Sequence, residues 1–169
     1  MLALPWYGYV YPCADDIVGG ACGQPCNQSG GVAQHTWNCT PGYNRDQGPM
    51  KPYEIGYQDI QPLLRTSPTG VMYDHATASA WFDFQCDMNT PKVGSTPCHP
   101  GRNQIWYDTP GTLELKYSML KAAGLRGVGM WDAGSVGYTE ADGQAALMWD
   151  ALSVFKGLPL NMSAKTAAP

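Results

Sequence analysis

The sequence predicts an α/β domain that carries a small disulfide-rich α+β insertion, and two observations lead to this fold class. Residues 102–134 carry the signals of a strand, a helix and a second strand within about thirty residues, the size of a βαβ unit. Residues 13–101 are instead rich in glycine, proline and cysteine. The 169 residues fit one domain, with a strand at 1–12, the insertion at 13–101, a strand-helix-strand-helix unit at 102–156 and a tail at 157–169.

The first segment, residues 1–11, is apolar and aromatic, which predicts one buried strand. Proline cannot donate to a sheet ladder, so Pro5 indicates a strand that is about to leave its sheet. Trp6 and Tyr7 would then lie at the C-terminal end of this strand.

The insertion begins with a long excursion over residues 14–52 that carries little regular structure. Apolar spacing over 53–64 predicts a short helix, although Pro62 lies inside it. Strands are expected at 71–73 and 79–86, and a loop at 87–101.

The unit at 102–156 opens with a strand over 104–108. Thr109 is a helix N-cap residue and Pro110 a typical first-turn residue, and Gly124 is a C-terminal cap. The apolar stripe of this helix consists of Leu113, Tyr117 and Leu120, widened by Leu115 and Met119.

A short strand over 126–131 and a helix over 139–155 close the unit. Thr139 and Asp142 have nearly the spacing of a capping box at the start of this last helix. Trp149 is expected to serve packing on the apolar face of the helix.

The net charge is −4, and only 14% of the residues are charged. No run of Lys or Arg is present, which argues against nucleic acid or an anionic membrane as a partner. No stretch approaches the length of a membrane span. Six tryptophans and ten tyrosines are typical of sugar-binding proteins and of secreted β-rich folds alike.

Six cysteines favour disulfides over a metal site. The candidates are Cys13, Cys22, Cys26, Cys39, Cys86 and Cys98, with Cys86–Cys98 as the preferred pair. Zinc is the alternative, since Cys22 and Cys26 are close and His99 follows Cys98, but no second close pair completes a tetrahedral set. We expect no metal and no cofactor.

Three glycosylation sequons, at Asn27, Asn38 and Asn161, indicate the secretory pathway. The first residues lack the features of a signal peptide, so we expect Met1 not to be the natural start.

The strand that ends at Trp131 has an unusual pattern. Side chains alternate along a strand, so Gly127, Gly129 and Trp131 point to the same side. The two glycines form an empty strip, here called the glycine strip, over which the indole could stack a sugar ring. Equally, Trp131 could be a core residue whose glycine neighbours make room for a helix.

Two runs, Ile105-Trp-Tyr-Asp-Thr-Pro-Gly-Thr-Leu-Glu-Leu-Lys116 and Gly127-Val-Gly-Met-Trp-Asp132, resemble the closing strands of the glycoside hydrolase family 18 barrel. The opening run Leu2-Ala-Leu-Pro-Trp-Tyr-Gly-Tyr-Val-Tyr-Pro-Cys13 resembles the seventh strand in the chitobiase branch of that family. The resemblance covers residues 1–156. It implies the C-terminal portion of a (β/α)8 barrel in which only about two of eight βα units are present. We therefore expect unpaired sheet edges where the other strands would lie.

The resemblance implies a substrate-assisted, retaining glycosidase. Its acid lies in an Asp-x-x-Asp-x-Asp-x-Glu motif that this sequence lacks, because none of Glu54, Glu114 and Glu140 has that context. We therefore expect no catalytic residue in this chain. No nucleophile elbow or dinucleotide loop occurs, and His35, His75 and His99 are scattered over the insertion.

Carried onto this sequence, the resemblance makes Trp131 the floor of a subsite for N-acetylglucosamine. Trp6 and Tyr7 would flank the cleft, with Tyr107 and Asp108 at its rim. For Asp108, helix capping is the favoured alternative. Asp132 stands where the chitobiase branch has an amide, and a structural role in the loop is favoured there.

Three hypotheses follow from these residues. The chain is the C-terminal segment of a chitobiase-like glycosidase that hydrolyses N-acetylglucosamine linkages of chitin-type or N-glycan-core oligosaccharides, and it is inactive alone. Alternatively, it is a noncatalytic chitinase-like carbohydrate-binding protein, or an inert fragment. The expected partners are N-acetylglucosamine oligosaccharides and the missing N-terminal half of the barrel, in a lysosomal or extracellular full-length protein.

Overall fold

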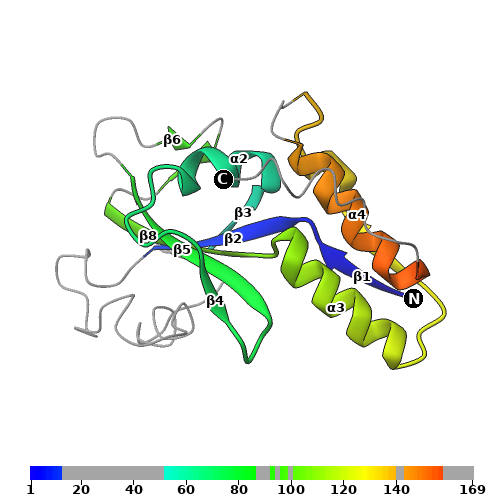
Figure 1. The fold of residues 1–169 in the computed structure, drawn as a ribbon. Coiled ribbons are helices and arrows are strands. Elements are labelled where there is room, and N and C mark those ends of the chain that lie inside the picture. Colours follow the sequence, from blue (N-terminus) through cyan, green and yellow to red (C-terminus); the bar gives the residue numbers. More distant parts are fainter. Residues whose placement is uncertain (13–51, 87–91, 94–95, 99–100, 140–142, 158–169) are drawn as a thin grey trace.

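The computed structural model describes residues 1–12, 52–86, 92–93, 96–98, 101–139 and 143–157, which form a mixed α/β structure (Figure 1). Strands β1 (Leu2–Pro5) and β9 (Val128–Trp131) form a parallel two-stranded sheet. A five-stranded antiparallel sheet has the order β3-β2-β8-β5-β4. Its strands are β2 (Tyr7–Pro12), β3 (Tyr53–Gly56), β4 (Met72–Asp74), β5 (Ser79–Cys86) and β8 (Gly101–Tyr107).

The remaining elements of the described residues are two short strands, three α-helices and a 3-10 turn. Strands β6 (Lys92–Val93) and β7 (Thr96–Pro97) pair with each other. The helices are α2 (Tyr57–Leu64), α3 (Pro110–Ala122), the 3-10 turn η2 (Ala133–Ser135) and α4 (Gln144–Lys156). Helices α3 and α4 lie beside β1, and α2 lies against the larger sheet (Figure 1).

The single strand predicted over residues 1–11 is two strands in different sheets. Pro5 ends β1, as its missing N–H predicts, and Trp6 separates β1 from β2. The Trp6 N–H donates to the Trp131 carbonyl at 2.8 Å, so the chain leaves the parallel sheet beside the end of β9.

The predicted βαβ unit has the right elements but the wrong pairing. Strand β8 lies in the antiparallel sheet, whereas β9 pairs with β1. Sequence proximity suggested that β8 and β9 would be neighbours, but β8 pairs with β2 and β5 in the larger sheet. The parallel crossover therefore runs from β1 through the strands of the larger sheet and α3 to β9.

Within the insertion, the helix predicted over 53–64 is a strand followed by a helix. Residues 53–56 form β3 because they pair with β2, and α2 begins at Tyr57 and contains Pro62. Strand β5 has the predicted bounds, and β4 lies one residue later than predicted. The predicted loop at 87–101 contains β6 and β7.

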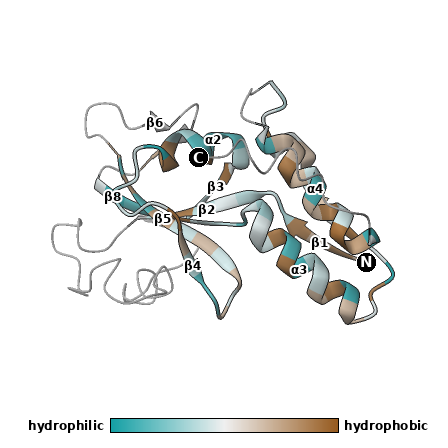
Figure 2. Ribbon diagram, viewed as in Figure 1, coloured by the Kyte–Doolittle hydropathy of each residue, from teal (hydrophilic) through white to brown (hydrophobic). Residues whose placement is uncertain are grey.

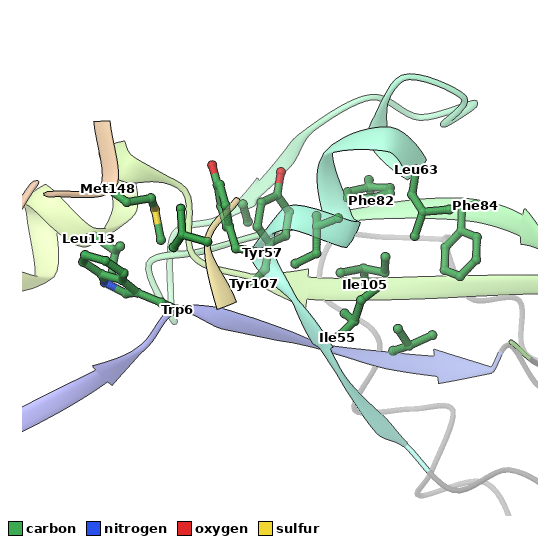
Figure 3. Close-up of a cluster of buried hydrophobic side chains, with 14 of the residues drawn as sticks. Trp6, Ile55, Tyr57, Leu63, Phe82, Phe84, Ile105, Tyr107, Leu113 and Met148 are labelled. Atoms are coloured by element: carbon green, nitrogen blue, oxygen red, sulfur yellow. The ribbon is translucent and has the colours of Figure 1, made fainter. Parts of the chain in front are cut away.

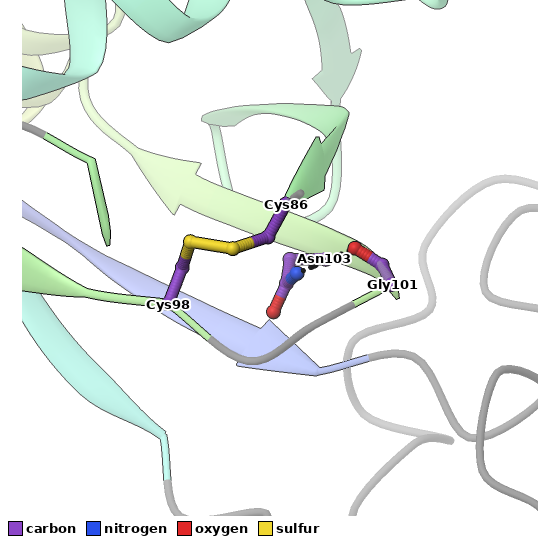
Figure 4. Close-up of a disulfide and its surroundings, with 4 residues drawn as sticks. All are labelled: Cys86, Cys98, Gly101 and Asn103. Carbon is purple, nitrogen blue, oxygen red and sulfur yellow. Dashed lines mark hydrogen bonds between the residues drawn. A yellow bond between two sulfur atoms is a disulfide. The ribbon is translucent and has the colours of Figure 1, made fainter. Parts of the chain in front are cut away.

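The preferred disulfide, Cys86–Cys98, is confirmed (Figure 4). It connects the end of β5 to the residue that follows β7, close to the start of β8. Asn103 on β8 donates from its side chain to the Gly101 carbonyl beside it, at 2.9 Å. The other four cysteines lie outside the described residues.

Helix α3 begins as predicted. The Thr109 side chain accepts from the Thr112 N–H, and the Thr112 hydroxyl accepts from the Thr109 N–H. Gly124 follows the helix with a left-handed φ of 74°. Leu113 and Tyr117 are buried, but the predicted widening of the stripe is wrong, because Leu115 and Met119 are exposed.

Helix α4 begins later than predicted. Its N-cap is Gly143 in a left-handed conformation, not Thr139, and Asp142 lies outside the described residues. Trp149 packs edge-on against Trp6, with ring centroids 5.0 Å apart, which confirms a packing role for this partly exposed residue.

One hydrophobic core joins the two sheets (Figure 3). Phe84 and Leu63 lie toward one end of it, and Trp6, Leu113 and Met148 lie toward the other. Figure 2 shows hydrophobic residues along β1, and both kinds of residue along α3 and α4. Burial against α3 and α4 therefore stabilises the short parallel sheet.

Within the described residues, β1 and β9 pair only with each other, which confirms the expectation of unpaired edges for that part of the chain. No helix in the described ranges has the length and apolar character needed to cross a membrane.

Candidate functional site

Trp131 lies at the C-terminal end of β9, and 67% of its surface is exposed. A Cβ at Gly129 would have no neighbouring atom within 4 Å, and one at Gly127 would only approach Met1. The glycine strip is therefore open, and no helix among the described residues fills it. Of the two interpretations of Trp131, the structure contradicts the buried core residue.

The backbone under Trp131 is held from both sides. The Tyr117 hydroxyl, from α3, donates to the Gly129 carbonyl at 3.1 Å. Pro5 is the register partner of Trp131, and the Trp6 N–H donates to the Trp131 carbonyl. These contacts give the exposed indole a rigid support in the parallel sheet.

Trp6 itself was predicted to flank the cleft, and its burial corrects that expectation. Its side chain is 0% exposed and packs against Trp149 within the core. An indole without exposed surface cannot stack on a ligand. The residue instead joins the β1–β9 sheet to α4.

Tyr7, the next residue, is half-buried at the start of β2. Its ring lies edge-on to Tyr9, with centroids 5.6 Å apart. Tyr7 therefore keeps part of its surface exposed, and its role beside a cleft stays a prediction.

Tyr107 is a second correction, because it is buried in the core and not at a rim. Its ring packs edge-on against Phe82, at a centroid distance of 5.7 Å, and also contacts Tyr57. Burial raises the pKa of its hydroxyl far above the ordinary value. Gln144, on α4, accepts from the Tyr57 hydroxyl at 2.9 Å, so this cluster connects the larger sheet to α4.

Asp108 is also buried, and its contacts are structural. Its carboxylate accepts from Thr112, at 2.9 Å, and from the Lys116 ammonium, at 2.6 Å. Lys116 also donates to the Ser79 hydroxyl at the start of β5. These bonds support the helix-capping alternative for Asp108, because the residue ties the first turns of α3 to the sheet.

Asp132 follows a cis peptide bond after Trp131 and caps the η2 turn. Its carboxylate accepts from the Ser135 N–H at 3.0 Å and from the Ser135 hydroxyl at 3.3 Å. This geometry supports the loop-structural role favoured from the sequence.

A polar chain on the larger sheet was missed from the sequence. The Trp106 indole N–H donates to Gln104 Oε1 at 2.8 Å, and Gln104 Nε2 donates to Asp83 Oδ1 at 2.9 Å. Asp83 is 1% exposed, and its burial raises the pKa of the carboxyl, partly offset by the Gln104 hydrogen bond. The sequence signal that could have identified this polar chain was the alternation of polar and apolar residues along β5 and β8.

Glu54 accepts from the Tyr9 hydroxyl at 2.9 Å on the sheet surface, and Glu114 lies on α3. The described residues contain no cluster of three His, Cys, Asp or Glu side chains placed to hold a metal. Glu140, His35, His99 and the predicted sequons at Asn27, Asn38 and Asn161 lie outside the described residues. Trp131 thus presents an exposed aromatic ring at the C-terminal end of β9.

Comparison with known proteins adds a family context. No protein-family profile matches the chain. Di-N-acetylchitobiase from Rattus norvegicus is 26% identical over 164 residues, a match that covers 90% of this chain. The chain spans only about a third of the length of the curated relatives it matches, with 36% of the rat protein covered.

Two solved structures share the fold. A chitinase from Chromobacterium violaceum covers 93% of this chain with a TM-score of 0.53 and 16% identity, and 32% of that chitinase is covered. Human YKL-39, described as a pseudo-chitinase, covers 93% of this chain with a TM-score of 0.55 and 14% identity, and 35% of it is covered. The resemblance found in the sequence is thus confirmed: along nine-tenths of its length this chain is similar to di-N-acetylchitobiase, and its fold occurs in chitinases.

Proposed function

We propose that this chain supplies a sugar-binding wall of a chitobiase-like glycosidase acting on N-acetylglucosamine linkages of chitin-type or N-glycan-core oligosaccharides. The observation that carries this proposal is the exposed Trp131 indole beside the open glycine strip. A flat aromatic face can pack against the apolar face of a sugar ring and exclude water from it. The similarity to di-N-acetylchitobiase supports N-acetylglucosamine as the ligand unit.

In this proposal the chain binds but does not hydrolyse. Substrate-assisted glycoside cleavage needs a carboxylic acid beside the glycosidic oxygen, with a pKa raised by its surroundings. The acidic motif that would provide it is missing from the sequence. The described part of the chain corresponds to the C-terminal portion of a (β/α)8 barrel, and a further barrel portion carries the acid. The parallel pairing of β1 with β9 supports this view.

An alternative is a noncatalytic chitinase-like binding protein. Human YKL-39, which has the same fold over this region, is described as a pseudo-chitinase with retained chitooligosaccharide binding properties. In both proposals Trp131 stacks on a sugar ring. They differ only in whether a catalytic carboxylic acid is also present at the site. The Cys86–Cys98 disulfide supports an oxidising compartment, in keeping with a lysosomal or extracellular protein.

Binding is tested by titrating the chain with the disaccharide of β-1,4-linked N-acetylglucosamine in a calorimeter. We expect Trp131→Ala to lower the affinity roughly tenfold or more, as the loss of a central aromatic contact does. Tyr73→Ala is the matched control, because it removes another exposed ring from β4, in the five-stranded sheet. Equal affinities of the unaltered chain and Trp131→Ala would contradict the proposal.

Hydrolysis separates the catalytic from the noncatalytic interpretation. The chain alone is expected not to turn over a fluorogenic chitobioside. Turnover that disappears on changing one of Glu54, Glu114 or Glu140 to Gln would show an acid in this chain and refute the mechanism proposed here. Turnover that appears only when the chain is refolded with the remaining two-thirds of a chitobiase would favour the glycosidase over the binding protein.

A further inference from the structure

A row of side chains crosses all five strands of the larger sheet. Tyr9 on β2 is the register partner of Glu54 on β3 and of Trp106 on β8. Trp106 is in turn opposite Trp81 on β5, and Trp81 is opposite Met72 on β4. Side chains alternate along strands, so this row lies on the sheet face opposite the one that fills the core.

The core face of the same sheet is already covered. Val10, Ile105 and Phe82, the sequence neighbours of the row, are fully buried. Helix α2 packs there, because a Cβ at Gly8 would lie 2.8 Å from the Ile60 side chain. Packing in the hydrophobic core therefore does not explain why aromatic side chains occupy this row.

The rings in the row have fixed orientations. Trp81 and Trp106 are stacked, with centroids 6.1 Å apart and an interplanar angle of 20°. The Tyr9 hydroxyl is oriented by its hydrogen bond to Glu54. Trp81 is buried, whereas Tyr9 and Trp106 each keep part of their surface exposed. The accessible part of the row is thus the pair Tyr9 and Trp106.

The polar chain behind Trp106 sets the direction of its ring. An indole N–H can only donate, so Gln104 must turn its oxygen toward Trp106. The Gln104 amide nitrogen then faces Asp83, which accepts from it. Asp83 is nearly fully buried, and its second oxygen, Oδ2, has no hydrogen-bond partner. A buried acceptor with an unused oxygen is costly, so this sheet retains Asp83 at a cost to stability.

We propose that Trp106 is a sugar-stacking residue of an accessory surface for longer N-acetylglucosamine oligosaccharides, with Asp83 and Gln104 as positioning residues. The proposal rests on the proposed function, because it extends the ligand bound at Trp131. The N–H of Trp106 is already satisfied, so the residue offers a ring face and no free donor.

The position of β2 supports continuity between the two sites. The strand starts at Tyr7, directly after the residue whose N–H bonds to the Trp131 carbonyl. Two residues further, about 7 Å along the strand, lies Tyr9, the register partner of Trp106. Strand β2 therefore connects the backbone beside Trp131 to the row. The partly exposed rings of Tyr9 and Trp106 suit the apolar face of a neutral sugar unit.

Ligand length provides the test. The affinities of the chain for the disaccharide and the hexasaccharide of β-1,4-linked N-acetylglucosamine are compared by calorimetry. We expect Trp106→Ala to weaken hexasaccharide binding about fivefold to tenfold, the cost of a lost stacking contact, and to leave disaccharide binding unchanged. Tyr73→Ala, which removes an exposed ring paired in register with the core-face residue Ala80, is expected to change neither affinity.

The positioning role is tested at Asp83. Asp83→Asn keeps an oxygen that can accept from Gln104, so we expect it to retain hexasaccharide affinity. Asp83→Ala removes the acceptor of the Gln104 amide and is expected to weaken binding of the hexasaccharide alone. If Asp83→Ala or Trp106→Ala fails to fold, Trp106→Phe keeps a ring but removes the N–H, and it is expected to weaken hexasaccharide binding to a lesser degree.

The outcomes separate the two proposals. Unchanged hexasaccharide affinity in Trp106→Ala, or in Trp106→Phe if the alanine variant does not fold, overturns the accessory surface. In that case, a loss of affinity in Trp131→Ala still supports the proposed function. If Trp131→Ala also binds both ligands normally, the proposed function and the accessory surface are both refuted. Equal losses in Asp83→Asn and Asp83→Ala overturn the positioning role only.

Discussion

Two glycines show how differently the same residue type is used at the residue scale. A Cβ at Gly8 would lie 2.8 Å from Ile60 Cδ1 and 2.9 Å from the Trp106 carbonyl oxygen. A Cβ at Gly129 would meet no atom within 4 Å. Gly8 therefore permits close packing of α2 on the larger sheet, whereas Gly129 leaves space at the surface.

This contrast gives a paired prediction. Gly8→Ala is expected to lower the free energy of unfolding by about 1–3 kcal/mol, because the backbone carbonyl cannot move aside. Gly129→Ala is expected to raise it slightly, by up to about 0.5 kcal/mol, since alanine loses less chain entropy than glycine on folding. Chemical denaturation checks both values. Gly129→Ala should nevertheless bind the disaccharide more weakly, and normal binding would show that the glycine strip is not part of the site.

At the scale of elements, helix α3 is attached to the rest of the structure through Asp108. The carboxylate is buried and bonds to Thr112 and Lys116 on the helix, and Lys116 reaches Ser79 on β5. One ion pair thus fixes the helix that carries Tyr117, and Tyr117 holds the β9 backbone at Gly129. The backbone beside Trp131 is therefore connected through Tyr117 to the helix that Asp108 and Lys116 anchor.

Lys116→Met is expected to lower the free energy of unfolding by about 3 kcal/mol. The physical reason is the buried Asp108 carboxylate, which loses its charged partner; Lys116 itself is 21% exposed, which places the effect at the low end for such pairs. Lys121→Met, one turn further along α3, is the control and should change it by less than about 0.5 kcal/mol. Similar unfolding curves for the two variants would argue against this role of the pair.

At the scale of the whole molecule, two sheets that differ in their stabilising contacts share one hydrophobic core. In the five-stranded sheet, the inner strands β2, β8 and β5 each pair with two neighbours. The Cys86–Cys98 disulfide ties the end of β5, and α2 packs on one face of the sheet. The parallel pair β1–β9 has two strands, and exposed Leu2 and Trp131 lie on them. Two-stranded sheets are marginal alone, so β1 and β9 depend on α3 and α4.

Amide hydrogen exchange should reveal this difference. The amides of β9 are expected to exchange faster than those of β8, because β9 lacks a second ladder partner among the described strands. Mass spectrometry of peptides from residues 101–107 and 128–131 makes the comparison within one sample. Equal protection of both peptides would indicate that the edge of β9 is covered.

Much of the local structure could be predicted from the sequence. The Thr109–Pro110 helix start, the strand at residues 79–86 and the Cys86–Cys98 pair depend on neighbours close in the chain. Strand alternation placed Gly127 and Gly129 on the same side as Trp131, but the structure was needed to show that the glycine strip is open. The candidate site was less predictable: Trp131 was identified, but Trp6 and Tyr107 are core residues, and the polar chain ending at Asp83 went unrecognised.

The sequence by itself determined the start of α3 and the bounds of β5, since caps, prolines and periodicity act over a few residues. Only the tertiary structure decided which strands pair. It joined β1 to β9 across more than a hundred residues and divided the first segment at Trp6. The physical reason is that these features depend on residues far apart in the chain. An aromatic side chain can be stabilised by burial in a core or by stacking on a ligand, and which of the two occurs depends on what the rest of the chain places against it.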